Sequence, residues 1–345
     1  MAKILVTGGA GYIGSHTIVD LVENGYEVVS IDNLSRGHQE LIEGASAIVG
    51  KPIKNYNIDL YNLEDIRAVF EENKDIQGVI HFAAYKSVPE SVDNPLMYFK
   101  NNLGSLINVL MVCKEYQIYN FVFSSSCSVY GNTNVLPVTE STPFEAAASP
   151  YARTKQMGEE ICEDFSFANP DFNIALLRYF NPVGAHPSCL IGERNKTPEN
   201  LVPIITQTAI GKREKMTVFG DDYATRDGSC IRDYIHVSDI AHAHTLSLKK
   251  LINDKKRGNI DYYNLGTGNG VSVLELIEAF QSTANLKLNF EIGPRRPGDV
   301  IEIYANNQKA LEELGWKPKY DINAMMETAW QWEKHLQKLE NAPLN

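Results

Sequence analysis

The sequence predicts an α/β protein with a Rossmann-type, doubly wound parallel sheet and a smaller mixed α/β carboxy-terminal lobe. Three observations predict this fold class. Short apolar runs alternate with segments of helical period, a glycine-rich turn follows the first run, and the rhythm changes after about residue 181. Strands that alternate with helices form parallel sheets that are covered by helices on both faces.

The individual elements follow from hydrophobic period and from turn residues. We expect strands at residues 3–9, 26–33, 78–84, 120–126 and 174–180, and helices at residues 15–25, 63–73 and 102–116. Residues 181–200 are dense in Pro, Gly and Asn and indicate a long loop. We expect residues 261–268 to return to the sheet, and residues 314–332 to form a turn and a closing amphipathic helix.

Bulk composition excludes several classes of partner. The net charge of the 345 residues is -11, which argues against nucleic acid and anionic membranes, because both bind basic surfaces. An anionic small molecule in a locally basic pocket stays possible. The five cysteines are scattered without a C-x-x-C, so neither a zinc site nor a disulfide framework is predicted. The start lacks signal-peptide features and no apolar run approaches ~18 residues, so we expect a cytoplasmic protein.

The stretch TGGAGYIGSH (residues 7–16) predicts a dinucleotide-binding turn. Gly8, Gly11 and Gly14 follow a strand and open a helix, so the backbone can approach a pyrophosphate at a helix amino terminus. Asp32 ends the next strand and can hold the two ribose hydroxyls of an adenosine. That carboxylate repels a 2′-phosphate, so NAD is preferred over NADP, although the nearby Arg36 softens the preference.

These observations divide the chain into two parts. We expect an NAD-binding domain of residues 1–181 with about 233–265, and a smaller lobe of about 182–232 with 266–345. A cleft is expected between them.

The stretch SPYARTK (residues 149–155) raises the question of catalysis. Ser149 and Pro150 predict a helix start, so Tyr151 and Lys155 share one face of that helix. Alone, such a pair is more often a surface contact. Ser126, however, ends a strand that points at the same crevice as the glycine turn. With Lys155 and a nicotinamide nearby, we expect the pKa of Tyr151 to fall toward neutrality and make it a general base.

Eight segments together carry a resemblance to a known family: TGGAGYIGSH, HFAAYKSV, FSSSCSVYG, SPYARTK, LLRYFNPVGAHP, IRDYIHVSDIA, YNLGTG and PRRPGD. They resemble the extended short-chain dehydrogenases/reductases, most closely the UDP-galactose 4-epimerase family, nearly end to end. The resemblance implies an isomerase that holds NAD tightly and acts on UDP-sugars, with UDP-galactose and UDP-glucose as the expected substrates. It also implies a homodimer whose interface is built on helices near 97–115 and 150–168.

The resemblance also implies the residues of each site. Catalysis is assigned to Ser126, Tyr151 and Lys155. The cofactor positions are Gly8, Gly11, Tyr12, Ile13, Gly14, Asp32, Asn33, Asp59, Leu60, Phe82, Ala83, Lys86, Asn101, Tyr151, Lys155 and Phe180. The substrate positions are Ser126, Asn181, Asn200, Phe219, Arg232, Arg296, Asp299 and Ile303. Arginine forks suit the substrate diphosphate, and Phe219 offers a flat face for uracil. No metal is expected.

Several alternatives stay open. Sugar-nucleotide dehydratases and decarboxylases carry an acid just after the strand-end Ser or Thr, whereas Cys127 and Ser128 follow here, which favours epimerisation. Cys127 lacks an evident histidine partner, so it is not favoured as a nucleophile. Ile303 leaves N-acetylated UDP-sugars open as substrates. An epimerase specific for N-acetyl sugars or uronates, and a non-catalytic NAD-binding sensor, are the remaining alternatives.

Overall fold

A seven-stranded parallel sheet organises the larger part of the computed structural model, which describes residues 1–341 except 196, 255–256 and 297–298. Every neighbouring pair of strands in this sheet is parallel. Its strands, in spatial order, are β11 (Ile260–Leu265), β6 (Asn173–Tyr179), β5 (Asn120–Ser126), β4 (Ile76–His81), β1 (Lys3–Thr7), β2 (Glu27–Ile31) and β3 (Lys54–Tyr56).

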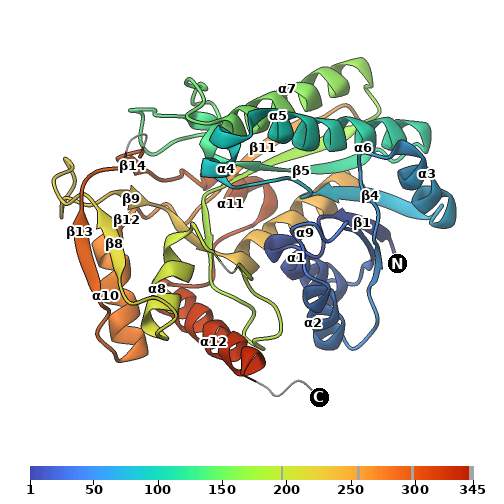
Figure 1. Ribbon diagram of the computed structural model, residues 1–345. Coiled ribbons are helices and arrows are strands. Elements are labelled where there is room, and N and C mark those ends of the chain that lie inside the picture. The colour runs from blue at the N-terminus through green and yellow to red at the C-terminus, as the bar shows by residue number, and fades with distance from the viewer. Residues whose placement is uncertain (196, 255–256, 297–298, 342–345) are drawn as a thin grey trace.

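Helices cover both faces of this sheet (Figure 1). One face carries α1 (Tyr12–Glu23), α2 (Gln39–Val49) and α9 (Val237–Asn253); the other carries α3 (Leu63–Glu72), α6 (Gly104–Glu115) and α7 (Pro150–Ala168). Three short helical segments connect β4 to α6: α4 (Val88–Asp93), α5 (Pro95–Tyr98) and the π-helical η1 (Phe99–Leu103). A 3₁₀ turn, η2 (Cys127–Tyr130), follows β5.

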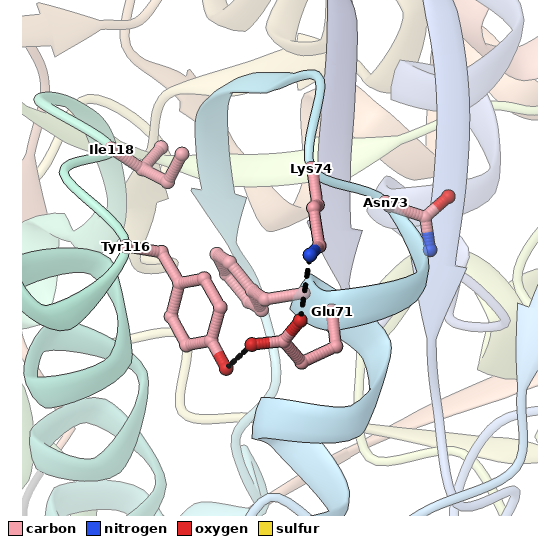
Figure 2. Close-up of a pocket in the computed structure, with 6 residues that line it drawn as sticks. Glu71, Asn73, Lys74, Tyr116 and Ile118 are labelled. Atoms are coloured by element: carbon pink, nitrogen blue, oxygen red, sulfur yellow. Dashed lines mark hydrogen bonds and ion pairs between the residues drawn. The ribbon is translucent and has the colours of Figure 1, made fainter.

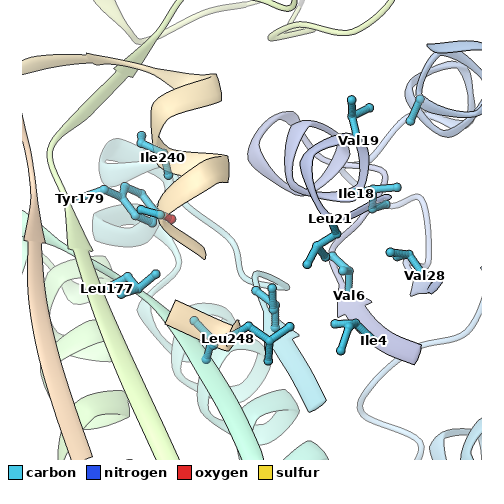
Figure 3. Packing of buried hydrophobic residues seen from close by; sticks show 14 of the residues in the cluster. Ile4, Val6, Ile18, Val19, Leu21, Val28, Leu177, Tyr179, Ile240 and Leu248 are labelled. Atoms are coloured by element: carbon cyan, nitrogen blue, oxygen red, sulfur yellow. The ribbon is translucent and has the colours of Figure 1, made fainter. Parts of the chain in front are cut away.

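The alternating faces of the strands fill two separate cores. Ile4 and Val6 of β1 face α1 and α9, whereas Leu5 faces the opposite layer. Figure 3 shows the first core, with Ile18 and Leu21 of α1 on one side and Leu177 and Tyr179 of β6 on the other. Because both faces are buried, strands such as KILVT read as nearly continuous apolar runs.

The smaller lobe consists of short strands and three helices, on the left and lower side of Figure 1. The strands form three small sheets: β7 (Asn181–Val183) with β10 (Tyr234–His236), β8 (Met216–Phe219) with β13 (Phe290–Gly293), and β12 (Val271–Ser272), β9 (Ile231–Arg232) and β14 (Glu302–Ile303) together. The helices are α8 (Leu201–Ala209), α10 (Val273–Ala284) and α12 (Ile322–Glu340), while α11 (Gln308–Leu314) packs through Ala310 on the core of the large sheet.

The five predicted strands, the three predicted helices and the returning strand at 261–268 are confirmed to within a few residues. The closing helix exists but continues to Glu340, past the predicted end. Helix α2 was not predicted, and residues 181–200 contain the short strand β7 besides loop. Within the described ranges, no helix combines the length and the apolar character that a membrane span requires.

Candidate active site

The glycine turn between β1 and α1 leaves no room for side chains. Gly8 has φ +74°, and a Cβ there would lie 2.8 Å from the backbone nitrogen of Ala83. A Cβ on Gly14 would lie 2.2 Å from the carbonyl oxygen of Gly8. The turn therefore presents bare backbone at the amino terminus of α1, which is the geometry that suits a pyrophosphate. The residues fit a dinucleotide at this point.

Asp32 lies at the carboxyl end of β2, beside this turn. Its carboxylate accepts hydrogen bonds from the backbone N–H groups of Ala10, at 3.1 Å, and Leu34, at 2.9 Å. Burial raises the pKa of Asp32 and these two bonds lower it. Arg36 is turned to other partners, since it pairs with Glu90 at 2.5 Å and lies over the ring of Tyr85. Because Arg36 pairs elsewhere, the Asp32 carboxylate suits ribose hydroxyls as hydrogen-bond donors and repels a 2′-phosphate.

The remaining predicted cofactor residues surround the carboxyl ends of the same strands. Asn33 donates to the carboxylate of Asp59 at 3.1 Å, and the hydroxyl of Tyr12 donates to the carbonyl of Gly184 at 2.5 Å. Phe82 follows β4 and packs on His244. Other members of the set occupy nearby places in the fold: Ile13 and Gly14 in α1, Leu60 before α3, Ala83 after β4, Asn101 in η1 and Phe180 after β6.

Ser126, Tyr151 and Lys155 converge at the carboxyl end of β5. Ser149 caps α7 by accepting from the backbone of Ala152 at 3.1 Å, and Pro150 is the first helical residue, so the predicted helix start is confirmed. The phenol of Tyr151 interacts with the hydroxyl of Ser126. One turn later, the ammonium of Lys155 donates to the carbonyl oxygen of Ser124 at 2.5 Å.

The protein groups alone do not lower the pKa of Tyr151; the expectation from sequence also included the positive nicotinamide ring. Desolvation raises the pKa of Tyr151 well above its usual value, and the contact with Ser126 only partly opposes it. Burial also lowers the pKa of Lys155 to about 8, while Glu159 acts in the opposite direction. The physical reason is that burial removes water from the phenol of Tyr151 and the ammonium of Lys155 and so favours the neutral form of each.

Three of the predicted substrate residues meet in the smaller lobe: Phe219, Arg296 and Asp299. Arg296 donates to a carboxylate oxygen of Asp299 at 3.0 and 2.6 Å, and its guanidinium lies over the exposed ring of Phe219. Arg232 pairs with Ile303 across β9 and β14. The charge of Arg232 acts to lower the pKa of the Cys127 thiol, although burial raises that pKa more.

Sequence reasoning missed three buried or nearly buried polar residues around the site. Glu193 accepts from Lys86 at 2.8 Å and from Asn200 at 2.9 Å, so it joins a predicted cofactor residue to a predicted substrate residue. Asp233 accepts from backbone N–H groups of Thr267, Gly268 and Ala305. Its own carbonyl accepts from the N–H of Asn181. Asp233 stands beside Arg232 in the IRDY segment, which was the available signal.

The third missed residue is Glu159, which lies two turns after Tyr151 on α7. It is completely buried and pairs with Arg178 at 2.6 Å. The available signal was its spacing, since Tyr151, Lys155 and Glu159 are four residues apart and therefore share one face of the helix.

Cys127 and the histidines do not add a nucleophile or a ligand set. Burial raises the pKa of the Cys127 thiol to about 12, so it stays protonated at neutral pH. His236 stacks on Tyr320, whereas His242 faces Asp20 and His244 packs on Phe82. Across the described residues, no three His, Cys, Asp or Glu side chains are grouped to hold a metal.

A surface hollow of about 260 Å³ is lined by Phe70, Glu71, Asn73, Lys74, Tyr116 and Ile118 and includes none of the residues of this site. Figure 2 shows it between the end of α3 and the end of α6, where Glu71 bonds both Tyr116 and Lys74. It contains none of the predicted site residues and lies toward the amino ends of the strands, so it takes no part in the chemistry described below.

A glycine turn, a strand-end acid and a Ser–Tyr–Lys group at one edge of a parallel sheet define a dinucleotide-dependent enzyme of the short-chain dehydrogenase/reductase type. Comparison with known proteins agrees. A family model described as GDP-mannose 4,6 dehydratase matches residues 5–329. A UDP-glucose 4-epimerase of Bacillus subtilis (strain 168) is 46% identical over 331 residues, which cover 96% of each chain.

Two solved structures are also similar. A UDP-glucose 4-epimerase from Stenotrophomonas maltophila, with bound NAD and formylated UDP-arabinopyranose, superposes with a TM-score of 0.95 at 43% identity, covering 98% of this chain and 100% of that one. The enzyme from Bifidobacterium longum in complex with NAD+ and UDP gives 0.92 at 43% identity, covering 96% and 98%. The chain belongs to the UDP-glucose 4-epimerase family of extended short-chain dehydrogenases/reductases.

Proposed function

We propose that this chain interconverts UDP-galactose and UDP-glucose by transient oxidation at carbon 4 of the sugar, with NAD held through turnover. The observation that carries the proposal is the convergence of Ser126, Tyr151 and Lys155 at the strand edge that also bears the glycine turn. The similarity to UDP-glucose 4-epimerases over nearly the full length of the chain supports it.

The cofactor is assigned to the crevice along β1, β2 and β4. The bare backbone at Gly8 and Gly14 would receive the pyrophosphate, and Asp32 would accept from the adenosine ribose. Lys155 would bond the nicotinamide ribose and Lys86 the pyrophosphate. When bound, NAD supplies a hydride acceptor and donor, and its positive ring adds the charge that the protein alone lacks for a phenolate at Tyr151.

The side chains of the chain divide the remaining work. Tyr151 takes the proton from the 4-hydroxyl of the sugar and later returns it, while Ser126 holds the same oxygen by a hydrogen bond. Arg232 and Arg296 anchor the diphosphate, so the resulting 4-keto sugar can turn about its bond to the diphosphate and present its other face. Proton and hydride both return, so the configuration inverts without net oxidation.

The residues after Ser126 favour this outcome over water elimination. Elimination needs an acid beside the substrate to protonate the departing hydroxyl. Cys127 and Ser128 occupy those positions, and the Cys127 thiol is a poor acid because its pKa is raised to about 12. This difference argues for an epimerase although the matching family model is described by a dehydratase.

The proposal is tested by proton NMR of UDP-galactose that is incubated with the purified protein without added cofactor. We expect UDP-glucose to appear until a stable mixture is reached. Unchanged UDP-galactose, with NAD demonstrably bound, would contradict epimerisation of the plain hexose. UDP-uronic acids would then be tried, and a protein that binds NAD but turns over no UDP-sugar would be a sensor.

N-acetylated UDP-sugars form the second arm of the same experiment. Ile303 is buried against Phe180, Val129 and Tyr130 and lies opposite Arg232. Its side chain is smaller than a tyrosine, so it leaves space beside the 2-position of the sugar. We propose that UDP-N-acetylgalactosamine is also converted, more slowly than UDP-galactose, and Ile303→Tyr should abolish only this second activity.

We further propose a homodimer and keep the two-domain division as predicted from sequence. Helices α6 and α7 pack on the sheet through one face, yet Ile107 and Met111 of α6 and Phe167 of α7 stay exposed. Contact with a second copy would cover these apolar side chains. Light scattering coupled to size exclusion tests this state. A cytoplasmic location also remains a proposal, based on the five free cysteines.

A further inference from the structure

We propose that Glu159 is a positioning residue that fixes the register of α7 on β5 through the hydroxyl of Ser125. This inference rests on the proposed function and extends it from the three reacting side chains to the contact that holds them. It concerns a buried group that the mechanism above does not use.

The first observation is a one-to-one match between α7 and three consecutive serines. Along the helix, Tyr151 interacts with the Ser126 hydroxyl and Lys155 donates to the Ser124 carbonyl. Glu159, one turn further, accepts from the Ser125 hydroxyl. Residues four apart on a helix share a face, so all three contacts are made by one stripe of α7. A displacement of the helix along the strand would break all three together.

The second observation is that the Glu159 carboxylate is itself held rigidly. It is completely buried, and Arg178 of β6 donates to it from Nε at 3.0 and 3.1 Å and from a terminal nitrogen at 2.6 Å. Arg178 also donates to the Tyr130 hydroxyl at 3.1 Å and to the Glu140 carbonyl at 3.0 Å. A carboxylate fixed from two sides makes a firm reference point for the serine.

An ion pair buried only for stability would not need the serine contact. Apolar side chains of similar volume often replace such pairs without loss of stability, so the pair alone is weak evidence of a stabilising role. Ser125, by contrast, is flanked on both sides by residues that touch the catalytic helix. The contact of its hydroxyl with Glu159 therefore helps to fix the position of Tyr151 relative to Ser126. A shift of about 0.5 Å between these two residues matters for catalysis.

Ser125→Ala is the primary test, because it removes the contact and leaves the Glu159–Arg178 pair in place. Glu159→Asp shortens the side chain by one methylene and so draws the carboxylate away from the Ser125 hydroxyl. In the holoenzyme we expect each to lower kcat for UDP-galactose by about tenfold to a hundredfold. The KM and the amount of bound NAD should stay within about twofold of the wild type. Because both changes act on one contact, the double variant should be little slower than the slower single variant.

Glu163→Gln is the matched control. Glu163 is one turn further on α7, is exposed, and accepts from the Tyr262 hydroxyl at 2.7 Å without touching β5. Its kcat should equal that of the wild type. The inference is wrong if Ser125→Ala keeps full kcat. It is also wrong if, in both variants, the fall in kcat is accompanied by a loss of bound NAD and a rise in KM. Independent, multiplicative losses in the double variant also contradict it.

A crystal structure of Ser125→Ala with NAD gives a readout that needs no turnover. We expect the Tyr151 hydroxyl to move away from Ser126 by at least about 0.5 Å relative to the wild type. An inactive wild type with this displacement in the variant would contradict the proposed function and support the positioning role. If the wild type is active, while Ser125→Ala leaves Tyr151 unmoved and kcat unchanged, the proposed function stands and the positioning role is wrong.

Discussion

Tyr151 is the proposed general base, and its protonation depends on what lies beside it. Burial raises the pKa of its phenol, and the ammonium of Lys155, one turn along α7, donates to the Ser124 carbonyl. If Tyr151 is the base, its ionisation requires additional positive charge. The ring of oxidised NAD would supply that charge, so the proposal ties proton removal to the oxidised cofactor.

Replacement of Tyr151 by Phe tests this role. The change removes the hydroxyl that is proposed to take the substrate proton and keeps the aromatic ring. We expect kcat to fall by about 10²- to 10⁴-fold, which is the usual contribution of a general base. Bound NAD should be retained, as measured in the supernatant after denaturation. A variant with more than a tenth of the wild-type kcat would show that another group takes the proton.

Lys155 should be a residue at which function costs stability. Its pKa falls from the usual 10.5 to about 8 in the folded protein, because the ammonium is buried. At pH 7 the charged form is therefore less favourable in the folded state than in the unfolded state. This penalty is present below pH 8 and disappears as pH rises toward the unfolded pKa.

Lys155→Met should accordingly be inactive and more stable at pH 7. We expect a gain of up to ~3 kcal/mol in the free energy of unfolding, less whatever the lost bond to Ser124 contributes. Urea unfolding of cofactor-free protein at pH 7 and pH 10 measures it, and the gain should shrink at pH 10. A less stable Met variant at pH 7 would show that the bond to Ser124 outweighs desolvation.

At the scale of elements, the turn between β1 and α1 is where a single methyl group should have its largest effect. The Cβ of an alanine at Gly14 would lie 2.2 Å from the Gly8 carbonyl oxygen and 2.9 Å from the Cα of Gly9, and these backbone atoms cannot move aside cheaply. Helix α1 would have to shift away from the turn. Because the turn is also the proposed pyrophosphate site, stability and cofactor binding should change together.

Gly14→Ala is expected to cost about 1–3 kcal/mol of stability and most of the bound NAD. Thermal unfolding and the NAD content per chain measure the two effects. Gly104→Ala is the control, since it also lies in a helix, and its Cβ would meet only the ring of exposed Tyr61, at 3.0 Å. Full NAD content in the Gly14→Ala variant would show that the turn is not part of the cofactor site.

The sheet elements could be predicted because their signals are local. KILVT and NFVFSSS are apolar runs of strand length, and β5 spans residues 120–126 as expected. Helix α2 was missed, although QELIEGASAIV is amphipathic, because no clear cap precedes it: His38 is the cap residue and makes no capping bond through its side chain. Glycine-loop and Tyr–Lys spacings likewise carry local information, so those site residues were accessible.

Long-range pairings were not accessible in the same way. Glu193 meets Lys86 across 107 positions of sequence, and Arg178 of one strand meets Glu159 of a helix that precedes it. No periodicity encodes which carboxylate a buried arginine selects. The desolvation of Tyr151, which raises the pKa of its phenol, was inaccessible for a related reason, because it depends on how the whole site packs and not on the spacing of Tyr151 and Lys155.

At the scale of the molecule, the charge is arranged to admit an anion into an acidic protein. The net charge is -11, yet Lys86, Arg232 and Arg296 are all assigned to the crevice. In the structure, Lys86 pairs with Glu193 and Arg296 with Asp299. These carboxylates keep the cations in place without ligand. We infer that a diphosphate competes with them for the same donors.

The same molecule buries four histidines in the neutral state, and this should make it sensitive to acid. Burial lowers the pKa of His16, His81 and His236 to about 3, and that of His244 to about 4. An unfolded histidine binds its proton near pH 6.5. Between these values the unfolded chain carries more protons than the folded one, so stability falls as pH falls. Above pH 6.5 the full stability is present.

The size of the effect is comparable with the stability of a whole domain. At pH 5 each histidine should lose about 2 kcal/mol, and four such losses approach the 5–15 kcal/mol that folded proteins typically possess. We expect urea midpoints to fall steeply between pH 6.5 and pH 5, with unfolding coupled to the uptake of about four protons. Carboxyl groups titrate mostly below this window, so they do not supply the slope. His244→Gln should lower the proton uptake by about one. A flat stability profile over this range would show that the buried imidazoles gain their protons within the folded protein.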